Sequence, residues 1–131
     1  MNYYFSTRIV GITFEEAVIK ITDALKKEGF GVLTEIDMKA TLKDKLNVDF
    51  RNYKILGACN PPMAHKALQT EDKIGTMLPC NVIVQERESG TIEIAAVDPA
   101  ASMLAIKNDQ LIAVAEAVRD KLKKVIDDLR V

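Results

Sequence analysis

Tryptophan is absent from the sequence, and aromatic residues make up only 5% of its 131 residues. Proteins that bind single-stranded nucleic acid stack bases on exposed aromatic rings, so this deficit argues against such a platform. An excess of one charge is also missing, because 18 Lys and Arg residues accompany 19 Asp and Glu residues. Proteins that bind a phosphate backbone carry a basic excess. We therefore expect no nucleic-acid partner.

Long apolar runs and clusters of metal ligands are lacking as well. No stretch reaches the length that spans a membrane, and the segment Met1–Gly11 lacks the basic start and apolar core of a secretory signal. The single histidine, His65, and the two cysteines, Cys59 and Cys80, form no compact ligand pair. We expect a cytoplasmic protein with free thiols, no membrane segment, no metal and no other cofactor.

Catalytic signatures are missing too. The sequence contains no glycine-rich phosphate loop, no serine nucleophile elbow and no HExxH motif, so no catalytic residue is assigned. Its composition, 48% hydrophobic and 28% charged, is that of an ordinary globular protein. A chain of this length can bury a sizeable core without a metal or disulfide. We expect one domain that covers residues 1–131.

Five segments have the residue pattern of β-strands: 2–8, 31–37, 53–58, 80–86 and 91–97. The last two are separated by the Ser89–Gly90 pair, which predicts a tight turn and a β-hairpin. Pro79 cannot donate a hydrogen bond to a sheet, so the fourth strand is expected to start after it.

Two long helices are predicted. The first begins at Thr13, which forms a capping-box pattern with Glu16, and ends at Gly29. The second begins after Asn108 and carries one apolar stripe at helical spacing. Shorter helices are predicted at 38–46 and at 61–68, the latter with Asn60 as its N-cap.

The element order is therefore strand, helix, four strands with a helical insert, and a final helix. Consecutive hairpin-like strands with a long helix at each end predict an α+β fold. We expect a mainly antiparallel sheet with the two long helices packed on one face.

Cys59 has two interpretations. It directly precedes a predicted helix start, where the partial positive charge of the helix N-terminus favours a reactive thiolate. However, Pro61 and Pro62 remove two N–H donors there, and no basic residue adjoins Cys59. The alternative is a small buried residue at a strand end, where free cysteines are common.

Cys80 lies in Leu78-Pro79-Cys80-Asn81 and shares with Cys59 a Cys-Asn pair beside a proline. If the third and fourth strands pair, both thiols lie at one end of the sheet. A redox couple would need Cα atoms within about 7 Å of each other, and the two cysteines do not have thioredoxin-type spacing. The redox interpretation and a simple packing role both remain open.

Carboxylates and lysines near strand ends are weaker candidates. Glu35, Asp37 and Asp98 have positions that an acid or base could use, although Asp98 before Pro99 is typical of a turn. A small basic cluster, made of Lys39, Lys43 and Lys45, would suit either an anion or a solvated face.

The segments Gly57-Ala58-Cys59-Asn60-Pro61-Pro62 and Leu78-Pro79-Cys80-Asn81-Val82 are distinctive together. With Glu35-Ile36-Asp37-Met38-Lys39 and Asp98-Pro99, they make the whole chain resemble the domain-of-unknown-function family number 302. The resemblance implies a fold similar to the TATA-binding-protein-like class, frequent homodimers and no established activity. The family's motif positions are here Asp37, Lys39, Cys59, Asn60, Pro61, Pro79, Cys80, Asn81, Asp98 and Pro99.

Two functional hypotheses follow. The first is a non-enzymatic, dimeric binding module that takes a small molecule or a protein near the two Cys-Asn turns. The candidate site residues are Cys59, Asn60, Pro61, Cys80, Asn81, Asp37 and Lys39. The alternative is a thiol-based redox or sulfur-handling protein that uses Cys59 with Cys80 as its resolving partner.

Overall fold

Five strands form one antiparallel sheet in the computed structural model, which describes residues 2–88 and 90–130. They are β1 (Tyr4–Val10), β2 (Gly31–Asp37), β3 (Tyr53–Cys59), β4 (Cys80–Glu88) and β5 (Thr91–Val97). Their order across the sheet is β1-β5-β4-β3-β2, so β1 and β2 are the edge strands. The predicted α+β class and the antiparallel sheet are confirmed.

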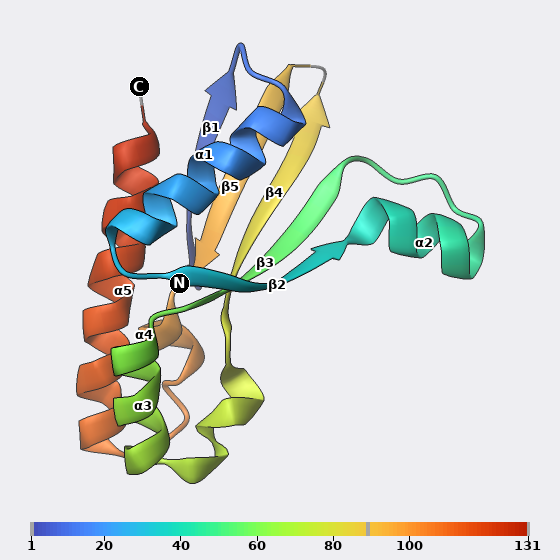
Figure 1. Ribbon diagram of the computed structural model, residues 1–131. Helices are drawn as coiled ribbons and strands as arrows, with labels where there is room; N and C mark the ends of the chain where they lie inside the picture. Colours follow the sequence, from blue (N-terminus) through green and yellow to red (C-terminus); the bar gives the residue numbers. More distant parts are fainter. Residues whose placement is uncertain (1, 89, 131) are drawn as a thin grey trace.

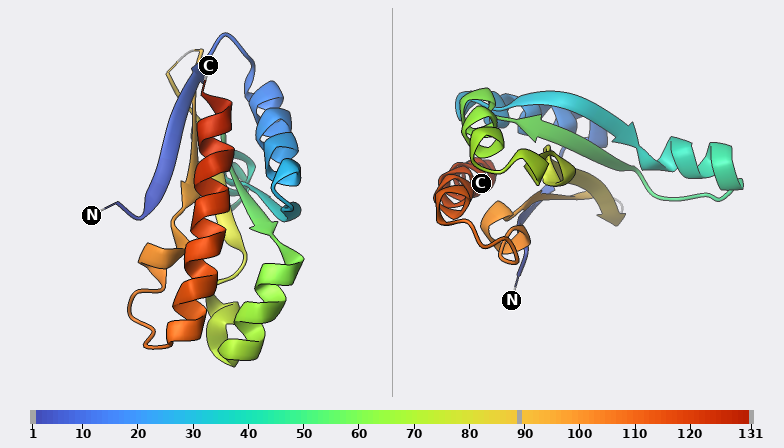
Figure 2. Two further views of the ribbon diagram at one scale, coloured as in Figure 1. Left: turned by 90° about the vertical axis from the view of Figure 1, so that its left-hand side faces the viewer. Right: turned by 90° about the horizontal axis from the view of Figure 1, so that it is seen from below.

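The helices are α1 (Phe14–Lys27), α2 (Met38–Leu46), α3 (Pro61–Thr70), α4 (Pro99–Ser102) and α5 (Asp109–Leu129), with a 3₁₀ helix η1 (Asp72–Met77). The two long ones, α1 and α5, pack against each other and against the same face of the sheet, as predicted (Figures 1 and 2). The sequence did not predict η1 or α4.

The predicted first strand begins and ends two residues too early. Arg8 is a charged residue of the kind that often ends a strand. In the structure it lies on the face of the sheet away from the helices and pairs with Glu93 of β5. The strand continues because Ile9 is buried opposite Ile92. The β4–β5 hairpin is confirmed, and Gly90 has the positive φ of its turn, whereas Ser89 lies outside the described residues.

The main core lies between the sheet and the two long helices. The Thr13–Glu16 capping box is present in both directions and starts α1, which buries Ala17, Ile21 and Leu25. The predicted apolar stripe of α5 is buried except for the half-buried Val114, and Ala115 and Ile126 belong to it as well. The side chains that α1 and α5 cover on the sheet include Leu56, Val82, Val84, Ile92 and Ile94.

A second, smaller core lies beyond one end of the sheet. Ala67 of α3, Ile74 of η1, Met103, and Leu111 and Ala115 of α5 are buried together there. Figure 1 shows α3, α4 and the first half of α5 grouped at that end. We call this group, with η1, the end lobe; it positions the candidate site.

Residues 31–48 form an arm made of β2, α2 and the start of the following loop. Helix α2 projects from the rest of the molecule in Figures 1 and 2 and buries none of its residues. Several large apolar side chains of the arm are exposed: Leu33, Ile36, Leu46 and Val48.

Candidate functional site

The two Cys-Asn turns meet at the end of the sheet that faces the end lobe. Strands β3 and β4 are antiparallel, and Cys80 at the start of β4 lies opposite Ala58 near the end of β3. Cys59 is the last residue of β3, so the carboxyl end of one strand and the amino end of the next bring both turns to one rim. This pairing was the condition on which the sequence-based site depended.

Asn60 ties the end lobe to the main body. Its Oδ1 accepts a hydrogen bond from the Met63 backbone N–H (3.4 Å), which caps α3, and its Nδ2 donates to the Glu28 carbonyl (3.3 Å) at the end of α1. Pro61 follows as the first residue of α3, where a missing N–H costs nothing. Asn60 therefore holds two helices in place, and half of the hydrogen-bonding capacity of its amide is used in doing so.

Gly57 keeps the two turns close. A Cβ at this position would collide with the Thr34 hydroxyl and would lie 2.6 Å from Cγ of Pro79. Only a residue without a side chain allows Pro79, the residue before Cys80, to approach β3 this closely.

Cys80 is buried, and burial raises the pKa of its thiol to about 11, with a smaller contribution in the same direction from the charge of Cys59. Cys59 is half-buried, and the two thiols are not joined in a disulfide. Cys80 is paired with Ala58 rather than with Cys59, and both cysteines line the cavity described next.

A cavity of about 290 Å³ lies between the rim and the end lobe. Its walls come from the sheet end (Ala58 and Cys80), from α3 (Ala67) and from α5 (Leu111 and Ala115). No described residue that lines it is charged. Apart from the two thiols, the polar side chain in its wall is that of Asn60, which is already hydrogen-bonded to the backbone.

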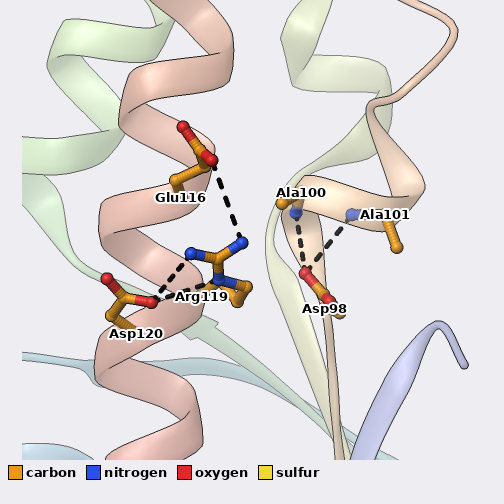
Figure 3. Close-up of polar contacts among 6 residues, drawn as sticks. All are labelled: Asp98, Ala100, Ala101, Glu116, Arg119 and Asp120. Carbon is orange, nitrogen blue, oxygen red and sulfur yellow. Dashed lines mark hydrogen bonds and ion pairs between the residues drawn. The ribbon is translucent and has the colours of Figure 1, made fainter.

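Charged residues of α5 stay outside this cavity. Arg119 pairs with Asp120 (3.0 Å) and lies 4.0 Å from Glu116, so the three side chains interact with one another, as Figure 3 shows. The apolar side of the same helix, with Leu111 and Ala115, faces the cavity. The helix therefore separates a charged surface from an apolar interior.

Asp98 acts as a helix cap. Its Oδ1 accepts hydrogen bonds from the backbone N–H groups of Ala100 (3.0 Å) and Ala101 (3.3 Å), as Figure 3 shows. These bonds fix the start of α4 and hold the buried Pro99 in the cavity wall. Asp98 therefore has a local structural role, as its position before Pro99 indicates. Its carboxylate accepts hydrogen bonds from backbone N–H groups.

Asp37 and Lys39 do not lie with the other candidate residues. Gly31 at the start of β2 pairs with Cys59, whereas Asp37 at its end pairs with Lys54. Six residues of strand separate those positions, or about 20 Å. Asp37 instead accepts a hydrogen bond from the Ala40 N–H (2.9 Å) and caps α2. These two residues are therefore not part of the site at the rim, because β2 runs away from it.

His65 is exposed on α3. Within residues 2–88 and 90–130, no group of three or more His, Cys, Asp or Glu side chains is placed to hold a metal ion. Over the same residues, no helix has the length and apolar character needed to cross a bilayer.

Sequence reasoning missed the end-lobe residues of the site, above all Ala67, Met103 and Ala115. The signal present in the sequence was the small residues on α3 and α5, which leave room between helices. Their common cavity depends on contacts between distant segments, which spacing along one helix does not reveal.

Comparisons with known proteins show the family and support the overall fold. The family model described as "Domain of unknown function DUF302" matches residues 6–129. The chain belongs to the DUF302 family. The crystal structure of an uncharacterized conserved DUF302 protein from Bacillus stearothermophilus is similar to it, with a TM-score of 0.88, 28% identity and 98% of each chain covered.

A curated relative of this DUF302 chain is an uncharacterized protein of Aquifex aeolicus, 26% identical over 94 residues. The match covers 72% of this chain and 59% of that relative, so the chain matches little more than half of the relative's length. These relatives support the fold and the family, and they carry no assigned activity.

Proposed function

We propose that this DUF302 protein is a non-enzymatic binding module that holds a small, uncharged, apolar molecule in the cavity at the Cys-Asn rim. The observation that supports the proposal is the cavity of about 290 Å³ with no charged residue among the described residues of its wall. A dry apolar cavity of roughly 150 Å³ accepts benzene, so this one has room for about a dozen non-hydrogen atoms.

The wall chemistry selects against charged ligands. The Asn60 amide is engaged with Met63 and Glu28, and the Cys80 thiol stays neutral below a pKa of about 11. An ion that entered would lose hydration without gaining a countercharge from any described residue of the wall. An aromatic or aliphatic hydrocarbon group would lose no hydrogen bond on entering.

The test is a titration with naphthalene, compared with naphthalene-2-sulfonate, and followed by amide NMR shifts. We expect naphthalene to shift the signals of Ala67, Leu111 and Ala115, and the sulfonate to bind at least tenfold more weakly. Ala115→Phe fills the cavity and should abolish binding. Ala113→Phe, on the exposed side of the same helix, is the matched control and should bind normally.

Two results would contradict this function. One is the absence of any naphthalene binding, and the other is equal binding of naphthalene and the sulfonate. Thermal unfolding of both phenylalanine variants establishes that each is folded before its affinity is compared.

We also propose that the module is a homodimer joined through its arm. The edge strand β2 has an unpaired side to which a second β2 strand could pair antiparallel, and the exposed Leu33, Ile36 and Leu46 lie along the same arm. Sedimentation velocity of Leu46→Lys should show a monomer. Leu104→Lys, an equally exposed leucine outside the arm, should leave the dimer intact. A wild-type monomer would refute the proposal.

The thiol-based redox alternative has weaker support. The raised pKa of Cys80 counts against a rapidly formed disulfide, because the thiolate is the form that attacks. We also propose a cytoplasmic location, where free thiols such as these two are kept reduced.

A further inference from the structure

A second hollow of about 240 Å³ adjoins the apolar cavity. The two share four wall residues: Pro79, Cys80, Pro99 and Met103. They are therefore separated by one layer of side chains. Met103 belongs to that layer, and its unbranched side chain can change rotamer more readily than a branched one.

Unlike the cavity, the second hollow has free hydrogen-bonding groups in its wall. Asn81 lines this hollow, and its exposed side chain makes no hydrogen bond with any other described residue. The Ser102 hydroxyl donates to the Pro99 carbonyl (3.1 Å), which leaves its oxygen able to accept. No described residue that lines this hollow is charged.

We infer that the ligand is amphipathic: its apolar body fills the cavity, and a neutral hydroxyl end passes Met103 to reach Asn81 and Ser102 in the second hollow. The inference rests on the proposed function and specifies its ligand class. A hydroxyl suits the site because its one proton can be donated to the Ser102 oxygen or to the Asn81 carbonyl, while its oxygen accepts from the Asn81 amide. Carboxylates and ammonium groups do not suit it, since no countercharge lines either space.

The length of the ligand follows from the size of the cavity. An apolar body of about a dozen non-hydrogen atoms corresponds to an alkyl chain of roughly ten carbons. The primary alcohol 1-decanol is therefore the probe, and decanoate and decylamine are its charged analogues. Naphthalene, which has no polar end, reports on the apolar cavity alone.

The experiment measures affinities of the full chain for these four probes by NMR titration, in wild type, Asn81→Ala and Gln69→Ala. We expect 1-decanol to bind more tightly than either charged analogue and to shift the Asn81 and Ser102 amide signals, which naphthalene leaves in place. Asn81→Ala should weaken 1-decanol about three- to tenfold, the worth of one net hydrogen bond, and leave naphthalene unchanged. Gln69→Ala, an exposed amide on α3, should change neither.

The possible results distinguish a failure of this inference from a failure of the proposed function. If naphthalene and 1-decanol both bind but Asn81→Ala affects neither, the apolar cavity stands and the polar end lies elsewhere, which overturns this inference. Decanoate binding as tightly as 1-decanol also overturns it. If no probe binds wild type, the proposed function fails together with the inference.

Discussion

The reactivity of Cys80 gives a direct test of the chemistry of the rim. Cys59→Ala leaves Cys80 as the single thiol, and its alkylation by iodoacetamide can be followed by mass spectrometry. Only the thiolate reacts, so the rate reports the ionised fraction as well as access to the sulfur. The same variant unfolded in urea provides the reference rate.

The expected magnitude follows from the pKa. Burial raises the pKa of Cys80 from 9.0 to about 11, and the smaller contribution of Cys59 is removed by the substitution. Each pKa unit changes the thiolate fraction tenfold, so at pH 8 the folded protein should react about a hundredfold more slowly than the unfolded chain. The rate should then rise about tenfold per pH unit until the pH approaches 11.

The same pKa shift makes the free energy of unfolding depend on pH. The unfolded chain ionises Cys80 above pH 9, whereas the folded protein keeps it protonated up to about pH 11. The contribution of the neutral thiol to stability is therefore complete below pH 9 and is lost as the pH rises through 11, by roughly 3 kcal/mol. Equal rates for folded and unfolded protein at pH 8 would refute this reasoning and would strengthen the redox alternative.

Two further substitutions test residues that position the elements around the site. Gly57→Ala should destabilise the fold by about 1–3 kcal/mol, because the added methyl group must displace Pro79 or Thr34. Urea unfolding measures this loss. An unchanged midpoint would contradict the close approach of Pro79 to β3. Asp98→Ala should cost about 0.5–2 kcal/mol by removing the cap of α4, whereas Asp98→Asn should keep most of that stability; equal losses in the two variants would mean that capping is not the role of this side chain.

The sequence predicts the sheet and the long helices because their signals are local. Capping pairs such as Thr13 with Glu16 depend on residues three apart, and strand alternation needs only a few consecutive residues. The four predicted strands after the first agree with the observed ones to within two residues. The position of β1 beside β5 had no such local signal, since it depends on pairing across most of the chain.

The site was predictable only in part for the same reason. The β3–β4 pairing brings Cys59 and Cys80 to one rim, as their Cys-Asn patterns suggested. Asp37 and Lys39 were grouped with them because they belong to the same family motif. A sequence motif does not tell how far apart its residues lie in space, and β2 carries both residues away from the rim. A motif can combine residues that cap different helices with residues that line a cavity.

Polar contacts at helix ends add to the small core of the end lobe. Asn60 caps α3 and reaches Glu28, and Asn108 caps α5 and donates to the Thr70 carbonyl (3.0 Å). These polar contacts fix the helix ends at defined positions. Beside the small core, short side chains such as Ala115 leave the cavity of about 290 Å³ unfilled.

An underfilled interior costs stability, so filling it should stabilise the protein while removing its function. Ala115→Leu adds three carbon atoms to the cavity wall, each worth up to about 0.8 kcal/mol when buried without strain. We expect urea unfolding to show a gain of up to roughly 2 kcal/mol and the naphthalene titration to show at least a tenfold loss of affinity. If the leucine instead destabilises the protein, the helices already pack closely around Ala115, and the space between them is too small for the ligand proposed.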